Sequence, residues 1–156
     1  MRNKLFLLCM MCLMTLLLQA QSEQYVDLGL PSGTLWKANN EAKLITFKEA
    51  FPKYTNNLPT KEQFEELKNK CVWTWYGKGY KVIGPNGNFI VMPTTGFLGA
   101  SGDFYQNNWG QYWSSTLPPD RSGCEAWTLS FSSATIDINY NSYSLLGFAV
   151  RLVKKP

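Results

Sequence analysis

The chain has 156 residues, with 15 basic and 11 acidic side chains and no histidine. Without histidine it lacks the commonest general base, the usual partner of serine and cysteine nucleophiles, and the commonest zinc ligand. Charges of both signs are mixed along the chain instead of forming a basic stripe, so we expect no nucleic-acid partner.

The first twenty residues have the layout of a secretory signal. Arg2 and Lys4 precede an apolar stretch over residues 5–18, and polar residues follow it. This stretch is shorter than the roughly twenty residues that a membrane-spanning helix needs, so we expect no stable membrane insertion. We predict cleavage after Ala20, which lowers the net charge from +4 to +2. The predicted location is the periplasm, the cell surface or the medium.

Residues 21–156 are long enough for a single domain with its own core. Residues 25–38 alternate loosely between apolar and polar side chains around a turn at Pro31 and Gly33, which predicts two short strands ending at Trp36.

Two helix starts follow. Thr46 and Glu49 form one capping-box pattern, and Thr60 and Gln63 form another. In the second helix, over residues 61–69, Phe64 and Leu67 share one face, which indicates packing against a core.

The second half of the chain has the pattern of short strands. A hairpin is predicted over residues 79–83 and 89–92, because residues 84–88 are typical of a tight turn. Further strands are expected over residues 112–115, 126–131, 134–140 and 147–153. Residues 94–111 are predicted to be one long irregular loop, and loops of that length are usually functional when they carry several aromatic side chains.

Five ordered blocks stand out, at residues 25–36, 58–67, 79–88, 112–116 and 147–151. Together they resemble the Fibrobacter succinogenes major paralogous domain family. They also look similar to the related C-terminal domain of the Legionella collagen-like protein. The resemblance covers almost all of residues 21–156 and implies an α+β, C-type-lectin-like fold. In that fold two helices flank short antiparallel sheets, and the first and last strands are paired. The second half is rich in loops and offers a binding surface. Members are typically surface or secreted bacterial proteins. This chain is shorter than the family pattern between Asn39 and Thr46.

Cys71 and Cys124 are the cysteines that remain after signal cleavage. An oxidising export route permits them to form a disulfide, which would close a loop of roughly fifty residues. Two unrelated buried thiols are the alternative, and the sequence leaves both open.

The remaining polar patterns favour neither a metal nor a cofactor. Residues 137–141 imitate the start of a calcium loop, but Ser142 and Phe148 stand where such a loop needs glycine and glutamate. Alternation makes this segment a strand, with Ile136, Ile138 and Tyr140 on one face. A glycosidase would need two acids on either side of one bond, and the acids of the second half are Asp103, Asp120, Glu125 and Asp137.

A candidate binding site lies in the long loop. Its aromatic rings and amides suit the apolar faces and hydroxyl groups of sugars, and its residues are Tyr105, Asn107, Asn108 and Trp109, with Asp120 and Arg121 expected on a neighbouring loop. The alternative is a loop held in place by its own aromatics. Trp113, Trp127 and Phe148 fall in strand segments and are predicted to be core.

These observations predict an exported, non-catalytic binding module that recognises a glycan or a surface protein. Two rival functions stay open: an enzyme of the formylglycine-generating type or a glycosidase, and a structural subunit of a surface assembly.

Overall fold

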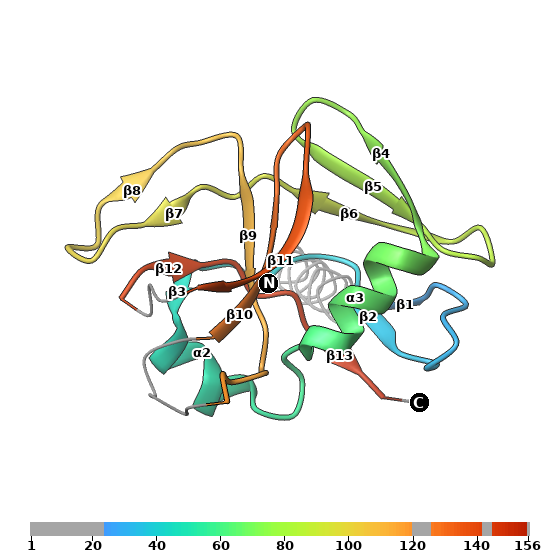
Figure 1. The fold of residues 1–156 in the computed structure, drawn as a ribbon, viewed down its shortest axis with the longest axis horizontal. Helices are drawn as coiled ribbons and strands as arrows, with labels where there is room; N and C mark the ends of the chain where they lie inside the picture. The colour runs from blue at the N-terminus through green and yellow to red at the C-terminus, as the bar shows by residue number, and fades with distance from the viewer. Residues whose placement is uncertain (1–23, 120–125, 142–144, 156) are drawn as a thin grey trace, which may run out of the picture.

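The computed structural model describes residues 24–119, 126–141 and 145–155, with the backbone alone at 140 and 141. The predicted signal, Asp120, Arg121 and Cys124 therefore lie outside the described residues. Figure 1 shows an α+β chain in which small antiparallel sheets pack together with two helices, α2 at the lower left and α3 nearer the centre. Within the described residues, no helix has the length and apolar character required to cross a membrane.

The two ends of the described chain meet in one sheet, which we call the terminal sheet. It contains β1 (Tyr25–Asp27), β2 (Leu35–Lys37) and β13 (Val153–Lys154), in the order β1-β2-β13. The predicted pairing of the first and last strands holds only loosely: β1 and β13 share one sheet, but each pairs with β2, which lies between them. The turn closed by Gly33 N donating to Leu30 O, at 2.9 Å, folds β2 back onto β1. Only the other edge of β2 is then left for β13.

Both predicted capping boxes are present. Helix α2 (Phe47–Tyr54) begins after Thr46, and α3 (Lys61–Lys70) begins after Thr60. Thr46 N donates to Glu49 Oε2 at 2.9 Å, and Thr60 N donates to Gln63 Oε1 at 2.8 Å. Backbone donors that a helix start leaves free are thereby satisfied. Phe64 and Leu67 are fully buried, as the spacing on α3 predicts.

The predicted hairpin of residues 79–92 is confirmed as β5 (Gly79–Ile83) and β6 (Phe89–Pro93). A strand that the sequence analysis did not predict, β4 (Val72–Trp75), pairs with the free edge of β5 to complete what we call the upper sheet. Trp73 and Trp75 both pack edge-on against Tyr80, with ring centroids 5.5 and 5.0 Å away.

The central sheet contains β9 (Gly110–Trp113), β10 (Ala126–Phe131) and β11 (Ile136–Asn141), in the order β11-β10-β9. Ile136 and Ile138 pack against the core, which confirms the alternation predicted for those two residues. Trp113 and Phe148 are fully buried as predicted. Trp127 is only partly buried, because its ring faces α3 at the surface, where Lys61 Nζ lies 4.1 Å from the ring centroid.

The fourth sheet, called the pocket sheet here, has the order β3-β12-β7-β8. Its strands are β3 (Ile45–Thr46), β12 (Gly147–Phe148), β7 (Phe97–Leu98) and β8 (Phe104–Tyr105). Two predictions are corrected here. Residues 94–111 are not wholly irregular, because β7 and β8 form a hairpin. Residues 147–153 are not one strand, because Ala149 leaves β12 to bridge to Tyr112 of β9 before the chain reaches β13.

Candidate functional site

The β7–β8 hairpin presents different side chains on its two faces. Strand alternation places Gly96, Leu98 and Phe104 on one face and Phe97, Gly99 and Tyr105 on the other. Each aromatic ring of β8 covers a glycine. A Cβ atom at Gly96 would lie 3.0 Å from the Phe104 ring, and one at Gly99 would lie 2.6 Å from the Tyr105 ring.

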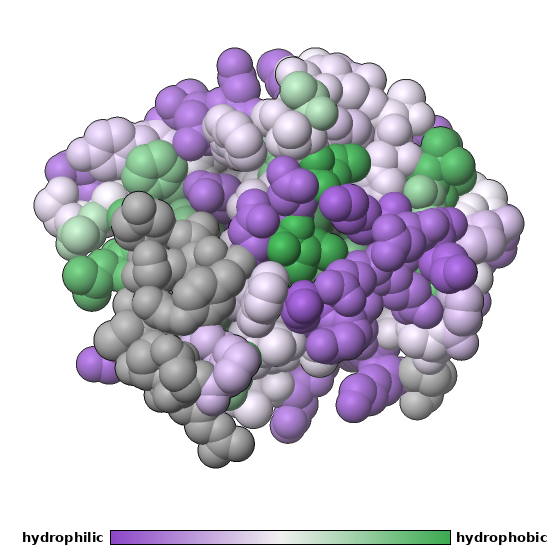
Figure 2. Space-filling view, viewed as in Figure 1, coloured by the Kyte–Doolittle hydropathy of each residue, from purple (hydrophilic) through white to green (hydrophobic). Residues whose placement is uncertain are grey.

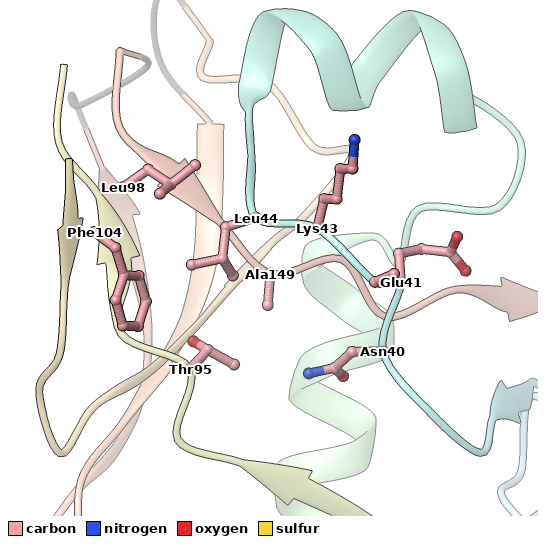
Figure 3. Close-up of a pocket in the computed structure, with 9 residues that line it drawn as sticks. Asn40, Glu41, Lys43, Leu44, Thr95, Leu98, Phe104 and Ala149 are labelled. Atoms are coloured by element: carbon pink, nitrogen blue, oxygen red, sulfur yellow. The ribbon is translucent and has the colours of Figure 1, made fainter. Parts of the chain in front are cut away.

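An open pocket of about 470 Å³ lies on the Phe104 face of this hairpin. In Figure 3, Phe104, Leu98 and Thr95 line one side, and Leu44 and Ala149 lie between them and the segment that carries Asn40. The volume falls within the range of about 300–1,000 Å³ that is typical of small-ligand pockets. Its full lining is Asn40, Glu41, Ala42, Lys43, Leu44, Thr95, Leu98, Phe104 and Ala149.

Two charged side chains of residues 40–44 differ in their partners. Glu41 is held on both oxygens, by Lys37 Nζ at 2.7 Å and by the Tyr54 hydroxyl at 3.1 Å. Figure 3 shows its carboxylate directed away from Phe104. Lys43 is exposed and forms no salt bridge with any described residue. The unpaired charge at the pocket is therefore positive.

Behind the pocket, Asn40 belongs to a buried polar network. Its Oδ1 accepts from Arg151 Nε at 2.8 Å, and its Nδ2 donates to the Tyr112 hydroxyl at 3.1 Å. The Tyr112 hydroxyl donates in turn to Pro93 O at 2.7 Å. An amide nitrogen carries two hydrogens, so one N–H of Asn40 is not used in this network.

Arg151 is 1% exposed and places its charge inside the protein. The rest of its guanidinium donates to the carbonyl oxygens of Lys37, Ala38 and Val91. Burial lowers the pKa of Arg151 and raises the pKa of Tyr112 to about 12. At neutral pH the network therefore contains a charged guanidinium and a neutral phenol.

The structure does not bring the predicted site residues together at one point. Tyr105 is 49% exposed and stacks on Phe97 with centroids 5.0 Å apart, on the face opposite the pocket. Asn107 Oδ1 accepts from Trp109 N at 3.0 Å, so it shapes the turn. Asn108 is exposed and Trp109 is 43% exposed. Asp120 and Arg121 lie outside the described residues.

The pocket itself was missed by sequence reasoning. Phe104 is the most exposed aromatic side chain among the described residues, at 54%, and only its alternation with Tyr105 in the hairpin could have singled it out. Asn40 and Lys43 lie in the segment that is shortened relative to the family pattern, where no motif marks them. Their proximity to residues 95–104 depends on β12, which joins β3 to β7.

The surface near the β7–β8 hairpin carries exposed hydrophobic and aromatic side chains. Figure 2 shows hydrophobic surface around the β7–β8 hairpin and β12, at the left of the view. Among the described residues, five aromatic side chains are exposed, and three of them are Phe104, Tyr105 and Trp109. The other two, Tyr76 and Phe89, lie at the upper sheet.

Other candidate chemistry is not gathered at the pocket. Cys71 caps the end of α3 and has a free thiol, and burial, assisted by the Glu66 carboxylate, raises its pKa to about 11. Asp137 lies on β11, where its Oδ1 is 3.9 Å from Lys68 Nζ. No group of three or more potential metal ligands occurs within residues 24–119, 126–141 and 145–155.

No protein-family model, curated protein or solved structure matches the chain.

Proposed function

We propose that the chain is an exported, non-catalytic binding module with a C-type-lectin-like fold that recognises a glycan or a surface protein. The binding surface is the β7–β8 hairpin, the pocket on its Phe104 face, and the following segment up to Trp109. The observation that carries this proposal is Phe104, which lines the pocket with 54% of its surface exposed. Tyr105 on the opposite face of the same hairpin and Trp109 in the following segment are also exposed, by 49% and 43%.

Exposed aromatic rings beside a pocket are available to contact a ligand. Each ring supplies a flat apolar surface, and aromatic residues are the side chains that carry most binding energy in interfaces. Sugars combine an apolar ring face with hydroxyl groups at the edge, so they match a pocket whose lining includes Phe104, Asn40 and Thr95.

The geometry gives less support to catalysis. Glu41 is the one carboxylate among the residues that line this pocket, and Lys37 and Tyr54 already occupy its oxygens. Glycoside hydrolysis needs a second carboxylate at a set distance from the first. A structural subunit would instead use the exposed apolar face and the edge strand β4 of the upper sheet.

The test compares alanine variants of exposed aromatic residues at the proposed surface with alanine variants of exposed aromatic residues elsewhere. A glycan array and capture from bacterial surfaces identify the bound material, and affinities are then measured for the variants. We expect F104A, Y105A or W109A to weaken binding at least tenfold, because each removes a ring from the proposed surface. F89A and Y76A, each removing a ring that is 49% exposed elsewhere, should change affinity less than twofold.

The reverse pattern contradicts the proposal. If the variants of residues 104–109 bind as tightly as the unmodified protein, the surface is wrong. Turnover of a substrate by the purified protein, abolished by replacing Glu41, would show that the chain is an enzyme.

A further inference from the structure

We infer that the pocket between residues 40–44 and the β7–β8 hairpin takes a sugar that bears a carboxylate, a hexuronate unit of an acidic glycan. The inference rests on the proposed function and specifies its ligand. It is carried by the charge of the pocket combined with the shape of its walls.

The charge around the pocket is unbalanced. Lys37, Lys43 and Arg151 contribute positive charge, and Glu41 is the acid among the lining residues. Because Glu41 is paired with Lys37, the charges of Lys43 and Arg151 remain without a carboxylate among the described residues. Asp103, which precedes Phe104, is not among the lining residues, and its Oδ2 accepts from Ser101 Oγ at 2.6 Å within the hairpin turn.

Arg151 acts on the pocket through Asn40. Its Nε donates to Asn40 Oδ1 at 2.8 Å, which draws electron density away from the amide nitrogen. Hydrogen bonds in a chain polarise one another, so the unused N–H of Asn40 becomes a stronger donor. A carboxylate is the acceptor that benefits most from such a donor.

Lys43 supplies the second contact. Figure 3 shows its side chain extended toward α2 from the segment that borders the pocket. Its side chain is exposed and has no salt-bridge partner among the described residues, and the four-carbon stem of a lysine is flexible. Lys43 lines the pocket, so the inference requires its ammonium to turn from α2 toward the bound carboxylate.

The walls favour a sugar over an acidic peptide. Among the lining residues, Leu44, Leu98 and Phe104 supply apolar surface, and Asn40 and Thr95 supply polar groups. A pyranose ring has one apolar face and a polar rim, whereas an extended acidic peptide needs a row of backbone partners along a strand. The rim of the pocket that carries Lys43 is where the carboxylate of such a ring would lie.

The experiment compares matched ligands that differ only in the carboxylate. Short oligomers of galacturonate, mannuronate and glucuronate are titrated against the protein, each beside the same oligomer after reduction of its carboxylates to alcohols. We expect at least one acidic oligomer to bind at least tenfold more tightly than its reduced form, and this preference to weaken as salt is added.

Lysine variants then locate the contact. K43Q should remove most of the preference for the acidic oligomer and leave affinity for the reduced oligomer unchanged, while K43R should retain the preference. K70Q removes an exposed lysine at the far end of α3 and should have no effect.

Three results would overturn the inference. These are an equal affinity for acidic and reduced oligomers, a preference that survives in K43Q, and polyglutamate binding that equals uronate binding and also depends on Lys43. If a neutral glycan binds and F104A abolishes that binding, the proposed function stands and only the acidic ligand is wrong. If no glycan binds and residues 104–109 are not needed for any partner, the proposed function fails as well.

Discussion

Arg151 carries its charge into the interior and is stabilised there by oxygens that are not ionised. Three backbone carbonyls and the Asn40 oxygen accept its hydrogen bonds. A buried charge is tolerated only when its donors are satisfied, so these acceptors fix where residues 37–40 and 91 lie. One side chain thereby sets the position of Asn40 at the pocket.

Tyr112 gives this network a dependence on pH. Its pKa is raised to about 12 because it is fully buried, whereas an unfolded tyrosine titrates near 10. Above pH 10 the unfolded chain releases this proton and the folded chain keeps it. The free energy of unfolding should therefore fall between pH 10 and 12, by about 2 kcal/mol from this residue.

Urea unfolding of the unmodified protein and Y112F, measured from pH 8 to pH 12, checks this prediction. The variant starts less stable because it loses the hydrogen bond to Pro93 O. Its further loss on going to pH 12 should be smaller than that of the unmodified protein. Parallel curves for the two proteins would contradict the buried neutral phenol.

The Cys71 thiol should be unreactive at neutral pH, because its pKa of about 11 leaves little thiolate to attack an alkylating reagent. We expect slow labelling by iodoacetamide at pH 8 and faster labelling as the pH approaches 11, followed by mass spectrometry of the peptide that contains Cys71. The thiol is free in the structure, so labelling that begins only after a reductant is added would contradict it and favour the disulfide with Cys124 that the sequence left open. Rapid labelling at pH 7 would show that the thiol is not protected by burial.

At the scale of elements, the turn after β1 and the turn between β5 and β6 lock together. The side-chain amides of Asn86 and Asn88 both donate to Asp27 O, at 3.0 and 2.8 Å. Gly84 lies so close to this turn that a Cβ atom there would be 2.1 Å from Leu28 O. Two sequence blocks of the family resemblance, residues 25–36 and 79–88, therefore join the terminal sheet to the upper sheet.

This contact predicts different effects for two glycines of the same turn. G84A forces the two turns apart and should lower the free energy of unfolding by about 2–3 kcal/mol. G87A has open space around its new methyl group but a φ of +85°, so it should cost only about 1 kcal/mol. Urea unfolding of both variants at pH 7 measures these changes. Equal decreases in the free energy of unfolding would show that the contact between the two turns does not stabilise the fold.

At the scale of the whole molecule, local patterns predicted local structure well. The capping boxes at Thr46 and Thr60 begin helices because their chemistry lies within four residues. The turn of residues 84–88 likewise predicted its hairpin. Residues 147–153 were predicted as one strand because their apolar run does not reveal that Ala149 bridges to Tyr112.

The site was harder to predict because it is assembled from distant segments. Asn40 and Phe104 lie 64 positions apart, and no local pattern states that they line one pocket. Tyr105 and Trp109 were recognised as a type of residue that binds sugars, but alternation in β8 puts Phe104, not Tyr105, on the pocket face. The type of side chain that suits a sugar could be predicted from the sequence. The face of the hairpin on which each side chain lies depends on how β7 and β8 pair.

The most direct test of the binding surface is a map of amide chemical shifts in isotopically labelled protein, titrated with an acidic oligosaccharide. Binding at the pocket predicts that the largest changes fall on residues 40–44 and 95–109, with residues 72–91 of the upper sheet unchanged apart from Val91, whose carbonyl contacts Arg151. Saturable changes centred on the upper sheet, or none for any glycan or surface partner that the protein retains, would contradict the account.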